Sequence, residues 1–423
     1  MGPKYQALKG MEDLLPGEVE KWQWLEGKAR IFLEAQGYKE IRTPLMEPAE
    51  LFQRSLGEAS DIVHKEMYQF EDRGGRQIAL RPEMTASVAR AVIENHLLKQ
   101  TGSLRLYYLG AMFRGERPQA GRRRQFHQIG IERVNAGGAP ADGEVISILW
   151  RLLAYWGLKG AELRLNYLGC AKDRPALLAS LKEYFLKRKE KLCADCNYRL
   201  EKNVLRIFDC KNEACQPVVR EAPWKDFCAD CRKDFDGIQD LLRQEHRIPF
   251  KLHQRLVRGI DYYTGAVFEV VAQGLGAQDA VAGGGRYDGL YESLGGGSVP
   301  ATGFSVGMER LFAALGEQDK DFFRSLDTRR VYIASLVTRA EDREFLEKQI
   351  LLLRESGIVV EVACGETSLS AHLKRANQLG VRLVLICGED EMKTKQFSLK
   401  DLEAHRQEKV AFSDTVAALR KLF

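Results

Sequence analysis

The 423-residue sequence predicts an α+β protein, and three observations lead to this fold class. First, Leu104 to Phe113 and Gln125 to Val134 have the pattern of paired antiparallel strands, with helices between other strands. Second, a charged helical stretch interrupts this pattern and holds six of the nine cysteines. Third, strands and helices alternate after Asp327, as in a small α/β domain. The expected domains are 1–327, with an inserted helical subdomain at 171–237, and 328–423.

The individual elements follow from periodicity and from the residues that stop it. Val19 to Gln36 has helical periodicity and ends at Gly37, a residue common at helix C-termini. Residues 114–124 contain proline and glycine, so they form a loop between two strands. The other expected elements are strands at Tyr38–Pro44 and Ile78–Pro82, a strand and turn at Val257–Val271, a helix at Thr85–Leu98, a glycine-rich turn entering a helix at Ala282–Leu294, and a strand running into a helix at Thr302–Leu315. In the terminal domain they are strands at Arg330–Leu336, Val359–Ala363 and Leu383–Cys387, and helices at Glu341–Glu355 and Ser370–Gln378.

Composition and charge exclude several classes of protein. Apolar residues make up 45% of the chain and charged residues 29%, which is ordinary for a globular protein and excludes a disordered or collagen-like chain. No uncharged apolar run approaches the roughly 18–20 residues that span a bilayer. The N-terminus lacks a secretory signal, so the expected compartment is the cytoplasm, without a membrane. The net charge of +5 is too small to identify a nucleic-acid-binding protein by itself.

Arginine is concentrated in unusual settings. Residues 114–124 hold five arginines and one glutamate, a local charge of +4. The glycine-rich phosphate loops G-x-x-x-x-G-K-[ST] and G-x-G-x-x-G are absent, so a bound nucleotide would need side chains to hold its phosphates. Arginine suits this task because it is always charged and grips phosphate oxygens with two parallel hydrogen bonds. Three segments carry such arginines: Phe113–Gln128, Leu256–Gly265 and Gly303–Phe312.

These segments resemble the histidyl-tRNA synthetases of class II. Phe113–Gln128 is similar to motif 2 of that family, and Gly307-Met-Glu-Arg310 is similar to motif 3. Leu256–Gly265 and Gly283-Gly-Gly-Arg-Tyr-Asp-Gly289 resemble two peptides peculiar to the histidine enzymes. Gly37–Pro44 fits motif 1, and Leu80–Ala86 fits the amino-acid-binding loop. The resemblance runs nearly end to end, from Gly10 into the terminal domain.

The resemblance implies a fold and an activity. The fold is an antiparallel sheet of six or seven strands with flanking helices, the helical insertion, and a C-terminal α/β anticodon-binding domain. The activity is that of a ligase, which activates L-histidine with ATP and Mg²⁺ to histidyl-adenylate and transfers histidine to the 3′ end of tRNA(His). Motif 1 implies a homodimer.

The resemblance also implies roles for individual residues. The arginines at the reacting groups would be Arg258, Arg114 and Arg310. ATP would be held by Arg114, Glu116, Phe126 and Arg310. Histidine would be held by Glu83, Met84, Thr85, Gln128, Glu132, Tyr262, Tyr263 and Tyr287. The tRNA acceptor end would meet Gln119, Arg122, Arg123 and Arg124. Because the attacking carboxylate is already ionised, activation needs alignment and charge neutralisation and not a general base, and we assign His127 no catalysis.

The cysteine cluster raises metal binding, because its spacings are those of ligand pairs. Our first hypothesis is a structural zinc site at the two C-x2-C pairs, Cys193, Cys196, Cys228 and Cys231. Cys210 and Cys215 are alternatives that could replace either pair, and six ordinary thiols are the other interpretation. We interpret Cys170, Cys364 and Cys387 as small buried hydrophobic residues.

Two other functions compete with the ligase. One is a non-catalytic synthetase-like regulatory subunit of histidine biosynthesis, which would bind histidine without charging tRNA. The other is a tRNA-binding module without chemistry. The intact set of Arg114, Arg258 and Arg310 argues against both.

Overall fold

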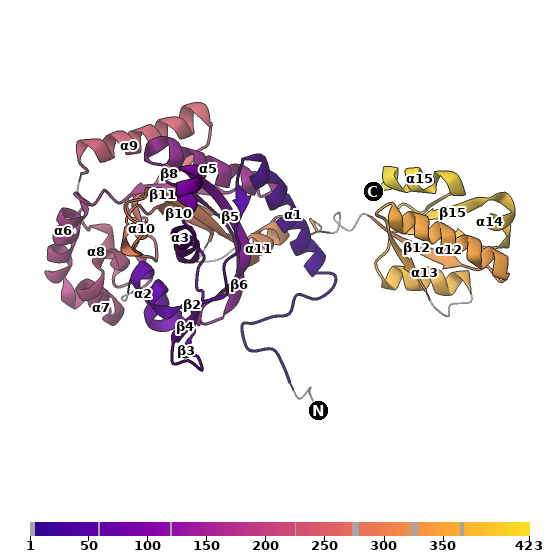
Figure 1. The fold of residues 1–423 in the computed structure, drawn as a ribbon, viewed down its shortest axis with the longest axis horizontal. Coiled ribbons are helices and arrows are strands. Elements are labelled where there is room, and N and C mark those ends of the chain that lie inside the picture. The colour runs from indigo at the N-terminus through magenta and orange to yellow at the C-terminus, as the bar shows by residue number, and fades with distance from the viewer. Residues whose placement is uncertain are drawn as a thin grey trace. The chain divides into compact units, whose positions relative to one another are not determined.

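The computed structural model describes residues 5–57, 60–118, 121–224, 226–272, 279–320, 322–323, 329–363 and 368–423. The chain divides into two compact units, Met1–Phe322 and Phe323–Phe423 (Figure 1). The expected boundary between residues 327 and 328 lies outside the described residues. Each helix within the described ranges is too short or too polar to cross a membrane.

The first unit is built on an eight-stranded sheet with the order β1-β5-β6-β11-β10-β9-β7-β8. Its six central strands pair antiparallel, which confirms the expected arrangement. The strands are β1 (Lys39–Glu40), β5 (Leu104–Phe113), β6 (Gln125–Val134), β7 (Glu162–Tyr167), β8 (Phe250–Leu252), β9 (Thr264–Val271), β10 (Ala280–Arg286) and β11 (Ala301–Gly307).

The two edge strands depart from the expected antiparallel pattern. Strand β1 pairs parallel with β5, and β8 pairs parallel with β7. Parallel neighbours need a long crossover connection, and both pairs have one. The helical insertion itself connects β7 to β8. The insertion is visible in the sequence. The strand pairing adds that the chain leaves the sheet after β7 and, after the insertion, returns beside it as the edge strand β8.

Helices and a small second sheet complete this part of the chain. The small sheet has the antiparallel order β2-β4-β3. Its strands are β2 (Met46–Pro48), β3 (Gln69–Glu71) and β4 (Gln77–Leu80). The helices outside the insertion are α1 (Val19–Ala35), α2 (Ala49–Leu56), the π-helix η1 (Ile62–Glu66), α3 (Thr85–Glu94), α4 (Leu97–Thr101), α5 (Gly138–Tyr155), α10 (Leu290–Ser293) and α11 (Met308–Gln318).

The insertion is helical, as expected. Its helices α6, α7 and α8 gather at one side of the first unit (Figure 1). Buried Leu181, Phe185 and Ile207 belong to the same apolar cluster as Val88 and Tyr108 of the sheet domain, so the insertion shares the main core. Its elements are α6 (Arg174–Leu186), η2 (Lys189–Lys191), α7 (Ala194–Lys202), η3 (Val204–Asp209), α8 (Gln216–Arg220), α9 (Ala229–Asp240) and η4 (Leu241–Glu245).

The second unit has a five-stranded sheet with the order β13-β12-β14-β15-β16. Its three parallel strands include β14, which is buried along its whole length and separates two apolar clusters. The final antiparallel pair was not expected from the sequence. The elements are β12 (Arg330–Ser335), α12 (Ala340–Glu355), β13 (Val359–Val362), α13 (Leu369–Gln378), β14 (Leu383–Cys387), α14 (Glu389–Thr394), β15 (Gln396–Asp401), β16 (Arg406–Ala411), η6 (Phe412–Asp414) and α15 (Thr415–Leu422).

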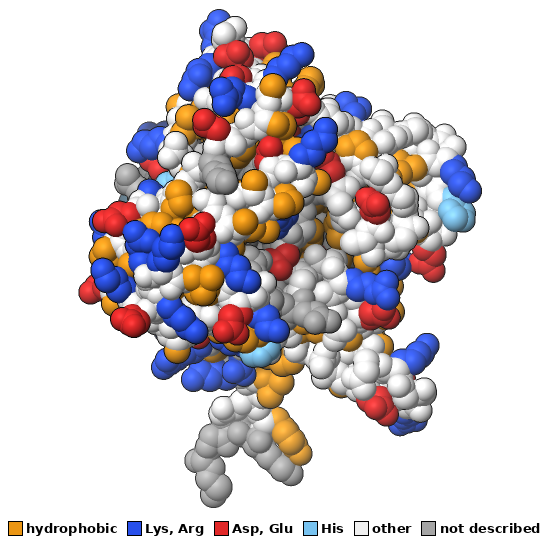
Figure 2. Space-filling model, turned by 90° about the vertical axis from the view of Figure 1, so that its left-hand side faces the viewer, with side chains coloured by type: hydrophobic (Ala, Val, Ile, Leu, Met, Phe, Trp, Pro, Cys, Tyr) orange, Lys and Arg blue, Asp and Glu red, His pale blue; other side chains and the backbone are white. Residues whose placement is uncertain are grey.

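Surface charge is mixed. On the face drawn in Figure 2, Lys and Arg side chains lie among Asp and Glu side chains. This pattern agrees with the small net charge of +5. Any strong concentration of positive charge must therefore be local, and the cavity described next has one.

Candidate active site

A cavity of about 560 Å³ opens beside the central strands of the large sheet. Strands β6, β10 and β11, the loop after β5, helix η1 and the insertion all contribute to its wall. It brings together most of the residues that the sequence singled out. Those lining it are Glu83, Thr85, Arg114, Glu116, Arg122, Arg123, Phe126, Gln128, Arg258, Tyr262, Tyr263, Tyr287 and Arg310.

Strand alternation decides which motif 2 side chains face the cavity. Phe126 and Gln128 on β6 line it, as a two-residue repeat requires. The intervening His127 is instead bound to Glu309, its Nδ1 lying 3.0 Å from the carboxylate. Its ring also meets Trp22 edge-on, with 5.1 Å between the centroids. His127 therefore packs against neighbouring side chains, and we assign it no role in the reaction.

Arg114 is held in place where β5 ends. Its Nε donates a hydrogen bond to the carbonyl oxygen of Pro82 at 2.9 Å. Its guanidinium carbon lies 5.1 Å from the centroid of the Phe126 ring, a cation–π contact. These two contacts fix the guanidinium at the cavity wall, where an anion could meet its remaining donors.

Arg258 is partly buried, and one of its donor atoms has no partner among the described residues. Its Nη1 lies 3.4 Å from Oε2 of Glu269, the only ion pair of Arg258 within the described ranges. Its Nε is buried and has no hydrogen-bond partner among the described residues. Such orphaned donors are rare in folded proteins and often mark a site that a ligand completes. A Cβ at Gly283 would overlap the Arg258 guanidinium, so the glycine-rich stretch of β10 gives this side chain its room.

Arg310 shows that the positive charges converge. Its Nη1 donates to the carbonyl oxygen of Ala280 at 2.6 Å. Burial lowers the pKa of Arg310, and the positive charge of Arg122 lowers that pKa further. Arg114 and Arg258 act in the same direction, against the opposing effect of Glu116. Four guanidinium groups from three separate stretches of sequence thus face one space, which favours a highly charged anion.

Glu116 is engaged with an arginine. Its Oε2 accepts a hydrogen bond from Nη1 of Arg122 at 2.5 Å, while Arg114 lies 3.9 Å from its other oxygen. The carboxylate therefore orders the motif 2 loop. Its expected contact with adenine stays a prediction.

The opposite part of the cavity is acidic and aromatic. The buried Glu83 carboxylate accepts the backbone N–H groups of Thr85 and Ala86 at 2.7 and 2.8 Å, and so caps helix α3. Burial raises the pKa of Glu83 in spite of these hydrogen bonds. A cation in the cavity would stabilise the charged form of Glu83.

Glu132 forms a buried network beside this carboxylate. It accepts hydrogen bonds from the Thr85 hydroxyl, at 2.8 Å, and from the Tyr287 hydroxyl. Burial raises the pKa of Glu132 to about 8. Tyr262 packs against Tyr263 and Tyr287, with ring centroids 4.7 and 5.4 Å apart. The result is an aromatic pocket with a carboxyl group behind it.

Three expected ligand contacts do not line the cavity. Met84 is turned into the core, where the Thr43 hydroxyl donates to its sulfur at 3.1 Å. Glu132 lies one layer behind Thr85 and Tyr287. The Arg124 side chain faces the backbone oxygen of Glu116 at 3.4 Å. The expected direct contacts of these three residues with ligands stay predictions, and Glu132 also acts on the pocket through its two partners.

The motif 2 loop also turns toward the N-terminal segment. The backbone N–H of Arg124 donates to the carbonyl oxygen of Gly10 at 2.7 Å. Arg123 pairs with Glu12 at 2.6 Å while lining the cavity. Gln119 lies outside the described residues.

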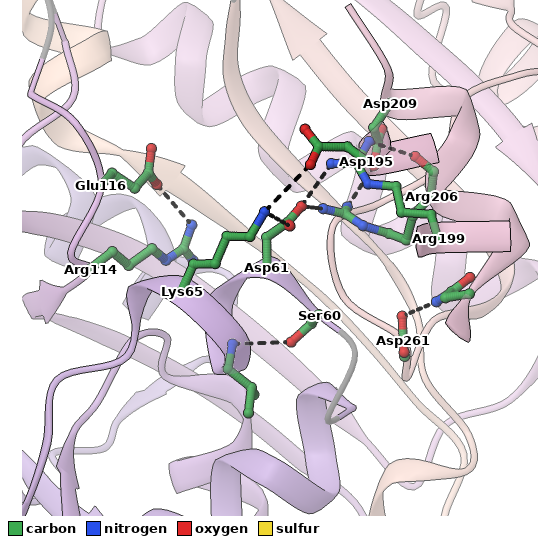
Figure 3. A network of polar contacts seen from close by, with 12 residues as sticks. Ser60, Asp61, Lys65, Arg114, Glu116, Asp195, Arg199, Arg206, Asp209 and Asp261 are labelled. Carbon is green, nitrogen blue, oxygen red and sulfur yellow. Dashed lines mark hydrogen bonds and ion pairs between the residues drawn. The ribbon is translucent and has the colours of Figure 1, made fainter. Parts of the chain in front are cut away.

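The insertion adds a wall that the sequence did not reveal. Asp61, just before η1, accepts hydrogen bonds from Arg199 and Arg206 of the insertion, both at 2.9 Å (Figure 3). Arg206 also pairs with Asp209 at 2.5 Å. All four residues line the cavity. No motif marks them, because Arg199, Arg206 and Asp209 are charged residues within an already charged insertion and Asp61 lies far from them in the sequence.

The cysteines fall into two groups, which corrects the first hypothesis. Cys193 and Cys196 lie with Cys210 and Cys215, one of the alternatives considered above. Cys228 and Cys231 lie elsewhere, with Cys170 and Asp173, because they begin helix α9 in the last part of the insertion. Cys170 is half-exposed in this second group, contrary to its expected role in the core. Cys387 is buried as expected, and Cys364 lies outside the described residues.

An antiparallel sheet that carries this arginine-lined cavity defines the class of protein, a class II aminoacyl-tRNA synthetase. A sequence model described as "Histidyl-tRNA synthetase" matches residues 10–192 and 199–311. Another, described as "Anticodon binding domain", matches residues 330–422. The chain belongs to the histidyl-tRNA synthetase family.

Individual relatives agree over the full length. The chain is 44% identical over 418 residues to "Histidine--tRNA ligase" of Moorella thermoacetica, covering 98% of this chain and 97% of the relative. It is 43% identical over 415 residues to the protein of the same name from Desulfitobacterium hafniense, covering 97% and 96%. The crystal structure of apo S. aureus histidyl-tRNA synthetase superposes with a TM-score of 0.77 at 28% identity, covering 98% of this chain and all of that one.

Proposed function

We propose that this protein is a ligase that activates L-histidine with ATP and then transfers histidine to the 3′ end of tRNA(His). The observation that carries the proposal is the convergence of Arg114, Arg258 and Arg310 on one side of a cavity whose other side holds a buried carboxylate. The full-length similarity to histidine–tRNA ligases supports the same function.

The first step forms the adenylate. A carboxylate oxygen of histidine attacks the α-phosphorus of ATP, the bond to the bridging oxygen breaks, and pyrophosphate leaves with the electron pair. The nucleophile is already ionised, so the protein must align two anions and neutralise the charge between them. Arg258, with its orphaned Nε, suits the position between carboxylate and α-phosphate. Arg114 suits the α-phosphate, and Arg310 suits the departing pyrophosphate.

Magnesium enters this scheme with ATP. The groups of three or more metal-ligating side chains in the described ranges lie in the insertion or at its ends, and not at the phosphate side of the cavity. Mg²⁺ often uses only one or two carboxylates and takes its other ligands from water and substrate phosphates. Glu116 and Glu269 line the cavity and fit such contacts. The ion would supply further positive charge at the triphosphate.

Histidine recognition follows from the acidic side. The Glu83 carboxylate, whose charge is disfavoured by burial, would be stabilised by the α-ammonium group of the substrate. An imidazole needs one donor and one acceptor at its two nitrogens. Tyr263 and the Tyr287–Glu132 pair provide polar groups at the aromatic pocket for this purpose.

The second step and the assembly rest on other surfaces. Arg122 and Arg123 lie at the cavity and suit phosphates of the acceptor end, while the second unit suits the anticodon.

We further propose a homodimer, because Leu45, Met46 and Phe70 around motif 1 expose 44–53% of their surface. Since its tRNA substrate serves translation, we place the protein in the cytoplasm.

The test is histidine-dependent exchange of pyrophosphate into ATP without tRNA, followed by tRNA charging. Arg258→Ala should lower exchange by about 10²–10³-fold, as for the loss of one transition-state donor, while thermal unfolding stays normal. Arg105→Ala is the matched control. Arg105 is an exposed arginine on β5 that pairs with Glu144 and is not among the residues that line the cavity. A regulatory subunit would bind histidine without exchange. Near-normal exchange by Arg258→Ala would refute the role given to this residue.

A further inference from the structure

The insertion contains two tight groups of metal-ligating atoms that the reaction does not use. In the first group, here called site A, the sulfur atoms of Cys193, Cys196, Cys210 and Cys215 all lie within 4.8 Å of one another. In the second, site B, the sulfurs of Cys170, Cys228 and Cys231 and a carboxylate oxygen of Asp173 meet the same limit. All of these cysteines are free thiols in the structure.

We propose that the insertion binds two zinc ions, one at site A through four thiolates and one at site B through three thiolates and the Asp173 carboxylate. This inference does not depend on the proposed function. Four thiolates form a closed structural zinc site, and a carboxylate oxygen is also a zinc ligand that can complete a set of three thiolates.

The spacing at site A fits tetrahedral coordination. Zinc–sulfur bonds of about 2.3 Å place the sulfurs of a tetrahedron about 3.8 Å apart. The sulfurs of Cys193 and Cys210 are 3.9 Å apart. A disulfide would need about 2.05 Å. Four thiols from two separate stretches that lie within 4.8 Å of one another, with one pair at the tetrahedral distance, are better explained by an ion than by apolar packing.

Hydrogen bonds at site A also favour thiolates. The backbone N–H of Cys193 points to the sulfur of Cys215 at 3.1 Å, and that of Asn212 points to Cys210 at 3.4 Å. Donors around a metal ligand orient it and spread its negative charge. Three of the four sulfur-bearing residues are buried, so a bound ion would be shielded from water.

Site B repeats the construction of site A. Cys193 precedes α7 and Cys196 lies in its first turn, just as Cys228 precedes α9 and Cys231 lies in its first turn. At site B the second pair is Cys170 with Asp173, which have two residues between them as Cys228 and Cys231 do, whereas the second pair at site A, Cys210 and Cys215, has four. Asp173 accepts the backbone N–H of Cys228 at 3.1 Å, so one of its oxygens already joins the two pairs. A carboxylate among three thiols is not an apolar arrangement.

The two sites occupy different positions in the insertion. Site B joins residues just after β7 to residues at the start of α9, so it closes the base of the insertion. Site A ties the start of α7 to the segment between η3 and α8. Between its ligands lie Arg199 and Arg206, the two arginines that hold Asp61 at the cavity (Figure 3). Site A therefore stabilises the part of the insertion that forms the cavity wall.

The experiment is metal analysis of the full chain purified without added zinc, together with variants. We expect about two equivalents of zinc in the wild type and about one in Cys193→Ser and in Cys228→Ser. Cys387→Ala, outside both sites, is the control and should keep two. Less than about 0.2 equivalents in the wild type would overturn the proposal. One equivalent, removed by only one of the two serine variants, would overturn the second site.

A spectroscopic measurement keeps the inference testable if a serine variant fails to fold. The wild type, stripped of metal and titrated with Co²⁺, should develop the intense visible absorption of tetrahedral thiolate ligation until two equivalents are bound. Weak absorption, typical of octahedral Co²⁺ on oxygen ligands, would contradict both sites.

Discussion

Gly283→Ala isolates the role of Arg258 without touching the arginine. Gly283 lies on β10 opposite Ser305 of β11 and Glu269 of β9, and its backbone is not in the left-handed region. Alanine is therefore compatible with the backbone. The obstacle is the Arg258 side chain, because the new Cβ would lie 2.5 Å from its guanidinium carbon.

The size of the effect follows from that distance. Carbon atoms in contact prefer about 3.5–4.0 Å, so the guanidinium must retreat by about 1 Å. A misplacement of about 1 Å at a reacting centre costs on the order of 10²-fold in rate. This corresponds to about 2.7 kcal/mol of transition-state stabilisation. We expect histidine-dependent pyrophosphate exchange to fall by that factor in Gly283→Ala.

The assay needs two comparisons. Gly289→Ala is the matched control, because a Cβ there meets nothing within 4 Å, and its exchange rate should be unchanged. In a chain that already carries Arg258→Ala, adding Gly283→Ala should change exchange by less than about twofold, since coupled sites are not additive.

Two results would refute the reasoning. One is normal exchange in Gly283→Ala, which would show that the position of Arg258 does not matter. The other is a full additional loss in the Arg258→Ala background, which would show that the alanine acts by distorting the sheet.

Two further predictions concern the buried charges. Glu132 has a pKa of about 8 in the folded protein against 4.5 for a free side chain, so between these values the native state holds a proton that the unfolded chain has lost. Relative to Glu132→Gln, the wild type should therefore lose up to about 1.4 kcal/mol of stability per pH unit from pH 5 to 8; parallel urea-unfolding curves across this range would contradict the burial argument. The Asp142 carboxylate accepts two hydrogen bonds of 2.9 Å from the Arg286 guanidinium, and both side chains are at least 94% buried. Asp142→Asn should lower the unfolding free energy by about 3–5 kcal/mol, and a loss below about 1 kcal/mol in urea unfolding would show that this pair is dispensable.

The sequence predicted three arginines that line the cavity, because each lies in a short motif. Arg114 follows β5, Arg258 lies in the loop between β8 and β9, and Arg310 lies in the first turn of α11; all three line the cavity. The sequence could not predict that the Met84 side chain points into the core. Met84 lies in a loop, where no helical or strand periodicity assigns a side chain to one face. The helix start at Thr85 sets that direction.

Long-range partners were the part that the sequence could not supply. The spacing of the cysteine pairs indicated ligands, but pairing C-x2-C with C-x2-C assumed that the two helix starts meet. The insertion instead brings each pair to a different segment. The contacts of Asp61 with Arg199 and Arg206 join residues more than a hundred positions apart, and no local pattern records them.

The central claim is that the arginines meet the reacting carboxylate and the phosphates in one cavity. A crystal structure of the protein with histidine and a non-reactive ATP analogue measures this directly. The Arg258 guanidinium should lie within about 3.2 Å of both the histidine carboxylate and the α-phosphate, with Arg114 on the α-phosphate. A complex in which both ligands bind and Arg258 contacts neither would contradict the account.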